Sequence, residues 1–547
     1  MKLGNIKLSN YCHYIFFFLF LLLGLSIYKD YGFNIDEAFQ RRSGFYWLNF
    51  LAEFFRLDSL AYIANEKFNN AIDFTMPWKE TDKTYGLIFD VPAALLEILF
   101  NLKDPLKFYE MRHLLTFLYF FIGSIYFYKL LVNRFGNRYI SLLGCLLLII
   151  TPRVFGEFFH NNKDIIFLSI FIITSYYYFK TIDNNNYKNI ILFALLSAIC
   201  TSTRILGLIF PITFLFIYLL SILSQKNDLK IINKVVTYFL FYIFFLVLHW
   251  PFLWDNPIKN FIFLITNLEN FGPSIIFFND NFFNTALVPY YYLSLWILIS
   301  TPILNILLFL CGFFLSAKIY IKKLFNFEKH SPKYDFWDNN IEKKDFFILI
   351  LFLIFFISGT FFTSKHYNSW RIFYFLNFFM VYFSIFFINS YLLKLKYKKN
   401  FKIVVIFLSL TILFNSYRVL LYHPYQSLYF NVLTTKKFKN QFEVDFTGLS
   451  GIEFLRLILK IDKRSEIKIG INSWYPLWRM KELLPEFDKK RIVFMYDDIK
   501  KADYVYSNRI YNVNAKKSNK FVLDDSFKPF KKLIIDGLII YEIHKKN

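Results

Sequence analysis

Two adjacent carboxylates, Asp36 and Glu37, come directly after the first apolar run of the chain, in the tetrapeptide NIDE. Acidic groups just outside a membrane-spanning segment lie where the headgroup of a lipid-linked substrate would be. The local sequence also offers a structural explanation. Asn34 or Asp36 could cap the following helix, and Glu37 could pair with Arg41 one turn later. The two interpretations predict different surroundings for the carboxylates.

A second polar cluster lies in the segment 151–164, between two apolar runs. Such a concentration of polar groups between two spans is typical of a substrate pathway. The structural alternative is a solvated turn in which Asp164 caps the next helix. The cluster consists of Glu157, His160, Asn161, Asn162, Lys163 and Asp164.

A third set of candidates is basic and lies on the side of the membrane that should be outside. Lys and Arg are rare there by the positive-inside rule, so another use is expected. Converging Arg and Lys side chains suit a phosphate group, although any one of them could be an interfacial anchor. As a set they favour an anionic lipid substrate. They are Arg112, His113, Arg204, Lys365, His366 and Arg371.

The elements that must position these residues are membrane helices. The 547 residues are 56% hydrophobic and 22% aromatic, and apolar runs that approach span length recur along the chain. The net charge of +23 comes from basic residues in short loops between these runs, which indicates membrane topology and excludes nucleic acid as the expected partner. The four cysteines show no metal spacing, and no nucleotide-binding or common hydrolase motif is present.

The basic loops thread the chain with the N-terminus in the cytoplasm and the C-terminus outside. About eleven spans satisfy this threading. The apolar stretch 85–102 carries Asp90 and Glu97 and is expected to lie along the outer interface. It belongs to a large external loop, 30–110. The expected spans are 11–29, 111–131, 138–151, 164–180, 189–203, 205–222, 235–250, 289–317, 346–362, 371–391 and 402–419.

The composition changes after residue 420. Short β-like stretches alternate with polar segments, and one amphipathic helical stretch follows Gly451. We therefore expect two domains: a polytopic helical membrane domain, 1–420, and a small extracytoplasmic α/β domain, 421–547.

An ordered set of segments resembles a known family. NIDE after the first span resembles the acidic motif in the first external loop of the GT-C glycosyltransferases, in particular the bacterial branch of the family 39 or PMT-like group, which includes protein O-mannosyltransferases and aminoarabinose transferases. The similarity covers most of residues 12–450. The other matching segments are KTYGLIFDVPAALLEIL, MRHLLTFLYFFIGSIYFYKLLVNRFGNR, TPRVFGEFFHNNKDIIF, STRILGLIFP, HWPFLWDNP, VPYYYLSLWILISTP, YNSWRIFYFLN and YHPYQSLYFN.

The resemblance implies an inverting transfer of a sugar from a polyprenyl phosphate to an acceptor on the outer face of a bacterial inner membrane. By analogy, Asp36 is the general base, Glu37 orients the acceptor or Asp36, and Asp164 matches a second acidic residue of the active site. Arg204 and Arg371 would bind the leaving phosphate. Lys163, His160 and His366 are further candidates, and no metal or cofactor is implied. The acceptor could be a protein, a lipid or a glycan.

Two other functions are considered. A transporter or flippase of lipid-linked saccharides would also need polar groups between helices, but would show inverted repeats and broken helices in corresponding halves, and neither is visible in the sequence. A non-catalytic scaffold would explain the C-terminal domain but would leave the acidic pair and the 151–164 cluster without a role.

Overall fold

The computed structural model describes most of the chain. In the description that follows, statements about the structure refer to these residues. They are 11–70, 80–184, 186–223, 229–267, 275–285, 287–325, 336–361, 368–395, 400–473, 475–496, 498–508 and 523–547.

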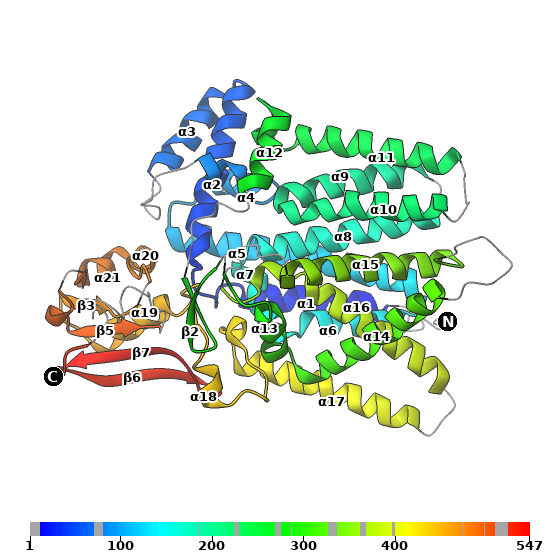
Figure 1. Ribbon diagram of the computed structural model, residues 1–547. Helices are drawn as coiled ribbons and strands as arrows, with labels where there is room; N and C mark the ends of the chain where they lie inside the picture. The colour runs from blue at the N-terminus through cyan, green and yellow to red at the C-terminus, as the bar shows by residue number, and fades with distance from the viewer. Residues whose placement is uncertain are drawn as a thin grey trace, which may run out of the picture.

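The chain folds into a bundle of long apolar helices, with a small sheet at one end (Figure 1). Within the described residues, six helices are long and apolar enough to cross a membrane, and α6 with α7 forms a bent pair that would make a seventh span. The six are α5 (Pro105–Phe135), α8 (Asp164–Asp183), α10 (Ile209–Leu223, with the turn before it), α14 (Ile303–Phe325), α15 (Asn340–Phe361) and α17 (Asn400–Leu421).

Four shorter apolar helices account for the remaining expected spans. Every one of the eleven expected spans therefore coincides with a helix, and the predicted polytopic helical fold is confirmed. A fifth short apolar helix, α12 (Pro257–Asn267), lies between the expected spans 235–250 and 289–317. The four helices are α1 (Cys12–Ile27), α9 (Tyr187–Thr203), α11 (Leu229–Leu248) and α16 (Leu376–Leu395).

Two expected boundaries differ from the structure. The stretch predicted as one span at 289–317 is broken into α13 (Tyr292–Ser300) and α14. Pro302 explains the break, because the residue before a proline avoids the helical region, and Thr301 is extended with φ −110° and ψ 141°. The span predicted from 371 begins as a short 3-10 turn, Arg371–Phe373, and the helix α16 follows only at Leu376.

The segment 151–164 is not a solvated turn. It contains a second helix, α7 (Pro152–His160), bent by 72° from α6 (Arg138–Ile149). Pro152 suits the first turn of a helix, where its missing N–H costs nothing. Every residue of α7 is buried, so the structural alternative for this segment is wrong.

The first large loop forms three helices that pack together beside the bundle (Figure 1). They are α2 (Ile35–Phe54), α3 (Asp58–Asn69) and α4 (Asp90–Leu99). Asn34 begins α2 with a capping box, in which its side chain accepts from the backbone of Asp36 at 3.0 Å and Glu37 accepts from the backbone of Asn34 at 2.9 Å. The helix expected at 85–102 is ten residues long.

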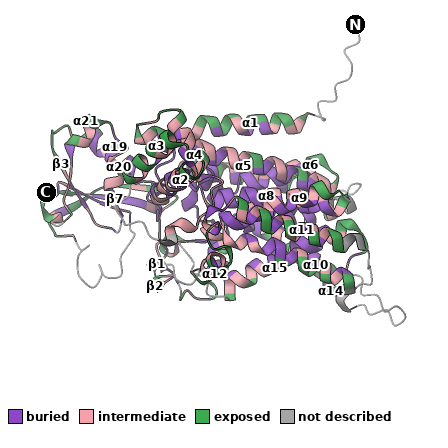
Figure 2. Cartoon of the chain, turned by 90° about the horizontal axis from the view of Figure 1, so that it is seen from above, coloured by how far each residue is buried: buried purple, intermediate pink, exposed green. Residues whose placement is uncertain are grey.

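The helices at the centre of the bundle, α8 and α9 among them, are largely coloured as buried in Figure 2. Small residues allow the closest approaches. Gly312 on α14 lies directly against the carbonyl of Phe383 on α16, and Gly123 on α5 lies against Ser169 on α8. Such contacts are typical of packing between membrane helices.

The C-terminal part forms the predicted small sheet. Its five strands run in the order β4-β3-β5-β7-β6. β3 is parallel to β4 and β5, whereas β7 is antiparallel to β5 and β6. The strands are β3 (Ile467–Ile471), β4 (Ile492–Phe494), β5 (Tyr504–Ser507), β6 (Phe527–Ile535) and β7 (Leu538–Lys546), and the helices beside them are α19 (Gly451–Ile461), α20 (Trp478–Lys481) and α21 (Glu486–Arg491).

Ion pairs at Asp536 connect this sheet to the preceding helices. Asp536 lies in the turn between β6 and β7, and it pairs with Arg418 at the end of α17 and with Lys439 on the short helix α18 (Lys436–Lys439). Before α13 in the sequence, β1 (Ile275–Phe278) and β2 (Asn281–Asn284) form an antiparallel hairpin.

Candidate functional site

Asp36 and Arg371 meet at the end of the bundle that adjoins the C-terminal sheet. The Arg371 guanidinium donates to Asp36 Oδ2, across 335 residues of sequence. The Asp36 side chain keeps 42% of its surface exposed, while Arg371 is 13% exposed. Asp36 is therefore a partly accessible carboxylate held beside a largely buried cation.

Glu443 fixes the segment that carries Arg371. Its Oε2 accepts from the Asn368 side chain at 2.7 Å, and its Oε1 accepts from the backbone N–H of Ser369 at 3.2 Å. Ser369 has a φ of +61°, a conformation that these contacts stabilise. Arg371 is therefore positioned by the chain just before the C-terminal sheet.

Glu37 points away from the exposed side of Asp36. Its side chain is fully buried, and Oε2 lies 3.1 Å from Nε2 of His113 on α5. The predicted cap by Asn34 is confirmed, but the predicted pair between Glu37 and Arg41 is wrong. Arg41 instead makes a bidentate contact with Glu97 on α4, because α4 packs against that face of α2.

Asp164 and Arg204 form a second ion pair, between the start of α8 and the end of α9. Asn161 orients Asp164 by donating to its Oδ2 at 3.0 Å and accepting from its backbone N–H at 2.9 Å. The same Asn161 amide donates to Glu157 Oε2 at 2.9 Å. Bound in this way, the Asp164 carboxylate is 4% exposed.

Lys163 lies among the acidic groups. Loss of solvent around its ammonium, and then the neighbouring Arg204, lower the pKa of Lys163 well below its ordinary value, against the opposing charges of Asp164, Asp90 and Asp36. These electrostatic contacts bring Asp36 and Asp164 into one cluster. The ammonium also lies over the ring of Tyr85, from the first external loop.

Asp90 is a member of this cluster that sequence reasoning did not select. It lies at the start of α4, and its Oδ1 accepts from Arg112 Nη2 at 2.5 Å. Burial raises the pKa of Asp90 to about 6, although Arg112 and Lys163 act in the opposite direction. The sequence feature that could have identified Asp90 is a carboxylate inside an otherwise apolar run.

His160 connects the two predicted clusters. It is fully buried at the end of α7, and its Nδ1 lies 3.3 Å from the Asn34 amide. Its Nε2 has no hydrogen-bond partner among the described residues. The ring of Tyr31 lies 6.0 Å from His160 and 5.6 Å from His423, measured between centroids.

Most of the predicted site residues thus come together, but in two layers. Asp36 is partly exposed and contacts Arg371, whereas Glu37, Arg112 and His113 are buried. His366 and Lys365 lie outside the described residues. Within the described residues, no group of three or more His, Cys, Asp and Glu side chains is arranged to hold a metal ion.

An apolar cavity of about 470 Å³ lies between α1, α6 and α17. Its walls are aliphatic and aromatic side chains such as Leu23, Ile149 and Val419, and His423 and Gln426 line it just beyond the end of α17. His423 pairs with Asp30, which follows α1. The polar end of this cavity therefore lies near Tyr31, the neighbour of His160.

Residues 92–254 match the family model of dolichyl-phosphate-mannose-protein mannosyltransferase. The matched segment covers less than a third of the chain. It runs from α4 to just beyond α11 and includes Asp164, Lys163 and Arg204, whereas Asp36 and Arg371 lie outside it. The resemblance to the PMT-like glycosyltransferases is confirmed for these residues, in a chain with several helices that could cross a membrane.

Among solved structures, the chain is similar to the oligosaccharyltransferase of Archaeoglobus fulgidus, crystallised as a complex with Zn and sulfate. The sequence identity is 10% and the TM-score is 0.41, over 78% of this chain and 59% of that one. This chain thus spans less than two thirds of the length of the archaeal enzyme. No curated protein matches the chain.

Proposed function

We propose that this protein is an inverting glycosyltransferase that moves a sugar from a polyprenyl-phosphate donor to an acceptor on the outer face of a bacterial inner membrane. The observation that carries the proposal is the Asp36–Arg371 pair, a partly exposed carboxylate beside a buried guanidinium at one end of the helical bundle. A base for the acceptor and a cation for the leaving phosphate are the two groups that such a transfer needs.

Asp36 acts as the general base. As the acceptor hydroxyl attacks the anomeric carbon, its proton passes to Asp36 and the bond from that carbon to the donor phosphate breaks. The carboxylate suits this step because it lies at the first turn of α2 with nearly half of its surface accessible. Glu37 positions Asp36 through the capping box rather than by touching the acceptor.

Basic groups stabilise the charge that develops on the departing phosphate. A guanidinium presents its N–H donors in a fork that suits a phosphate, and Arg371, which donates Nη1 to Asp36, is the first candidate for this role. Arg204 and Lys163 lie in the same charge cluster and are the further candidates. Asp164 holds Arg204 in place and keeps the cluster close to neutral.

The lipid chain of the donor fits the apolar cavity between α1, α6 and α17. Helices that span the membrane form its walls, so an isoprenoid tail could enter it from the bilayer. The polar end at His423 reaches toward His160 through Tyr31. In this arrangement the N-terminus is cytoplasmic, and residues 421–547 form an extracytoplasmic domain.

The test is a transfer assay in membranes that contain the full-length protein. Radiolabelled polyprenyl-phosphate sugars and a crude envelope fraction are supplied to wild type, to Asp36→Asn and to a matched control, Asp58→Asn, whose exposed carboxylate begins α3. Loss of a general base lowers the rate by about 10²–10⁴-fold, so we expect label to reach an acceptor with wild type and the control only.

Arg371 offers a second arm of the same assay. Arg371→Lys retains the charge but loses the fork that can bind two groups, so we expect it to recover only part of the activity lost in Arg371→Ala. Transfer that is independent of Asp36 would contradict the assignment of the base. Movement of labelled lipid-linked sugar across the bilayer, without any transfer to an acceptor, would show that the protein is a flippase and not a transferase.

A further inference from the structure

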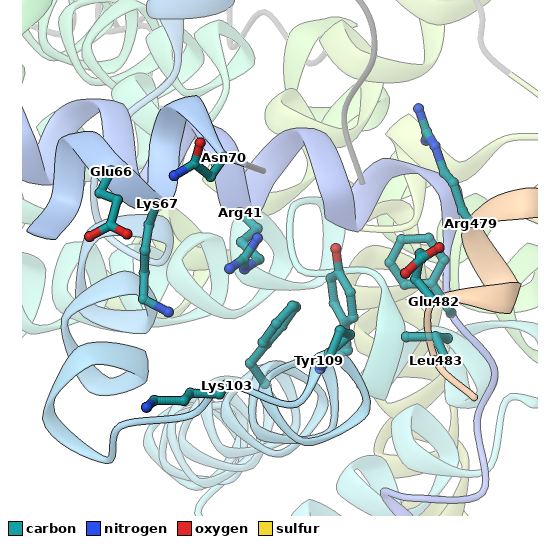
Figure 3. Close-up of a pocket in the computed structure, with 12 residues that line it drawn as sticks. Arg41, Glu66, Lys67, Asn70, Lys103, Tyr109, Arg479, Glu482 and Leu483 are labelled. Atoms are coloured by element: carbon teal, nitrogen blue, oxygen red, sulfur yellow. The ribbon is translucent and has the colours of Figure 1, made fainter. Parts of the chain in front are cut away.

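A second polar cavity lies beside the candidate site, where the first external loop meets the C-terminal part of the chain (Figure 3). Its volume is about 200 Å³, and residues from α2, α3, the start of α5 and α20 line it. Arg41, which lines it, is five residues beyond Asp36 on α2 and thus about 140° around the helix. The cavity and the Asp36–Arg371 pair therefore lie on different faces of α2.

The cavity presents charges of both signs. Figure 3 shows Lys67, Lys103 and Glu66 on one side of Arg41, and Arg479 and Glu482 on the other side. The lining has four basic and two acidic side chains, and Glu97, which accepts from Arg41 and Lys67 behind the lining, reduces the excess positive charge to one. The arrangement offers hydrogen-bond donors and acceptors together, which suits a neutral ligand rich in hydroxyl groups.

Aromatic rings form the apolar part of the lining. Phe33, Phe108 and Tyr109 all line the cavity. Phe33 and Tyr109 pack edge to face with their centroids 4.4 Å apart, and the Arg41 guanidinium lies 3.9 Å from the centre of the Phe108 ring. The apolar C–H faces of a pyranose ring pack on aromatic rings, and the hydroxyl groups at the edge of the pyranose form hydrogen bonds.

The charged lining is held in place before any ligand binds. Glu97 accepts from Arg41 at 2.9 and 2.8 Å and from Lys67 at 2.9 Å. On the opposite side, Arg479 donates to the backbone carbonyl of Ile35 at 3.1 Å. Side chains that are already ordered lose little entropy on binding, which favours a specific site over a merely polar surface.

We propose that this cavity is a binding site for one neutral sugar unit of a glycan, separate from the catalytic site. It would hold a saccharide at the junction of the external loop and the C-terminal part, and it gives α20 a role in recognition. The inference rests on the cavity alone and does not require that the protein transfer a sugar.

The test measures binding to the purified full-length protein in lipid nanodiscs. The probes are fluorescently labelled neutral trisaccharides of glucose, mannose and galactose. Lys103→Ala and Glu66→Gln remove one donor and one acceptor from exposed positions, so both variants should fold. The matched control is Lys107→Ala, an exposed lysine on α5 that does not line the cavity.

We expect saturable binding of at least one trisaccharide, about tenfold weaker in Lys103→Ala and Glu66→Gln and unchanged in Lys107→Ala. Asp36→Asn should leave the binding unchanged, which separates this site from the catalytic one. Absence of saturable binding, loss of binding in Asp36→Asn, or displacement of the probe by inorganic phosphate would each overturn the proposal.

Discussion

Replacing Glu97 by glutamine should loosen the helices that carry the candidate base. Glu97 is fully buried on α4, and it joins α4 to α2 through Arg41 and to α3 through Lys67. Glutamine has nearly the same shape but no charge. The substitution therefore leaves two cations facing a neutral group, with little change in packing.

The size of the effect follows from burial. Removing one partner of a buried ion pair costs about 3–5 kcal/mol, because the remaining charge loses a counter-ion at a position with little solvent. Arg41 is 8% exposed at its side chain and retains this cost, whereas Lys67 is 26% exposed and can turn toward water. We therefore expect the lower end of the range, about 3 kcal/mol.

The pH dependence gives an independent check. Burial alone would raise the pKa of Glu97, but Arg41 and Lys67 outweigh it and lower the pKa below the ordinary 4.5. A depressed carboxylate pKa stabilises the fold above the unfolded value, and the stabilisation is lost as the pH falls through the folded value. The difference between wild type and Glu97→Gln should thus shrink below a pH of about 4.5.

Thermal unfolding in detergent can be followed with a dye that reacts with thiols, in a background in which the accessible Cys12 and Cys311 are replaced by serine. Cys145 and Cys200 are fully buried and then become reactive only on unfolding. Glu97→Gln should unfold several degrees below wild type. The control is Glu66→Gln, an exposed carboxylate on α3 next to Lys67. If both variants unfold at the same temperature, the buried pair does not stabilise the loop and the reasoning fails.

Two further predictions concern packing and a buried acid. Gly312→Ala should lower the free energy of unfolding by about 1–3 kcal/mol, and with it the unfolding temperature in the same assay, because the new methyl group would overlap the Phe383 carbonyl on α16. Leu307→Ala on the exposed face of α14 is the control. Burial raises the pKa of Asp445 to about 7, so wild type loses stability as the pH rises from the unfolded value of 3.8 through 7. Asp445→Asn cannot ionise and should gain up to about 4 kcal/mol relative to wild type between pH 4 and pH 8, measured by intrinsic fluorescence; an unchanged difference would show that the acid ionises freely.

Local features of the sequence predicted much of the fold. Hydrophobic run length placed a helix in each of the eleven expected spans, although one of these spans is divided into α13 and α14. The change of composition after residue 420 indicated the C-terminal sheet. The cap at Asn34 was also predictable, because capping involves only residues within one turn. The break at Pro302 divided an expected span for an equally local reason, which the apolar run concealed.

The candidate site was only partly predictable. The types of residue were recognisable, since carboxylates and arginines at the outer ends of spans are costly unless used. Their partners were not. The spacing in the sequence suggested a pair between Glu37 and Arg41. In the packed structure, Glu37 contacts His113 and Arg41 contacts Glu97.

The sequence by itself determined where most of the helices lie and which polar groups needed partners, because hydropathy, capping and proline act on a residue and its near neighbours. Only the tertiary structure decided that Asp36 lies beside Arg371, that Asp90 joins the cluster, and that α7 is buried. These outcomes depend on which helices pack together. Charged groups pair with the opposite charges that lie near them in space, and Asp36 and Arg371 are 335 residues apart in the sequence.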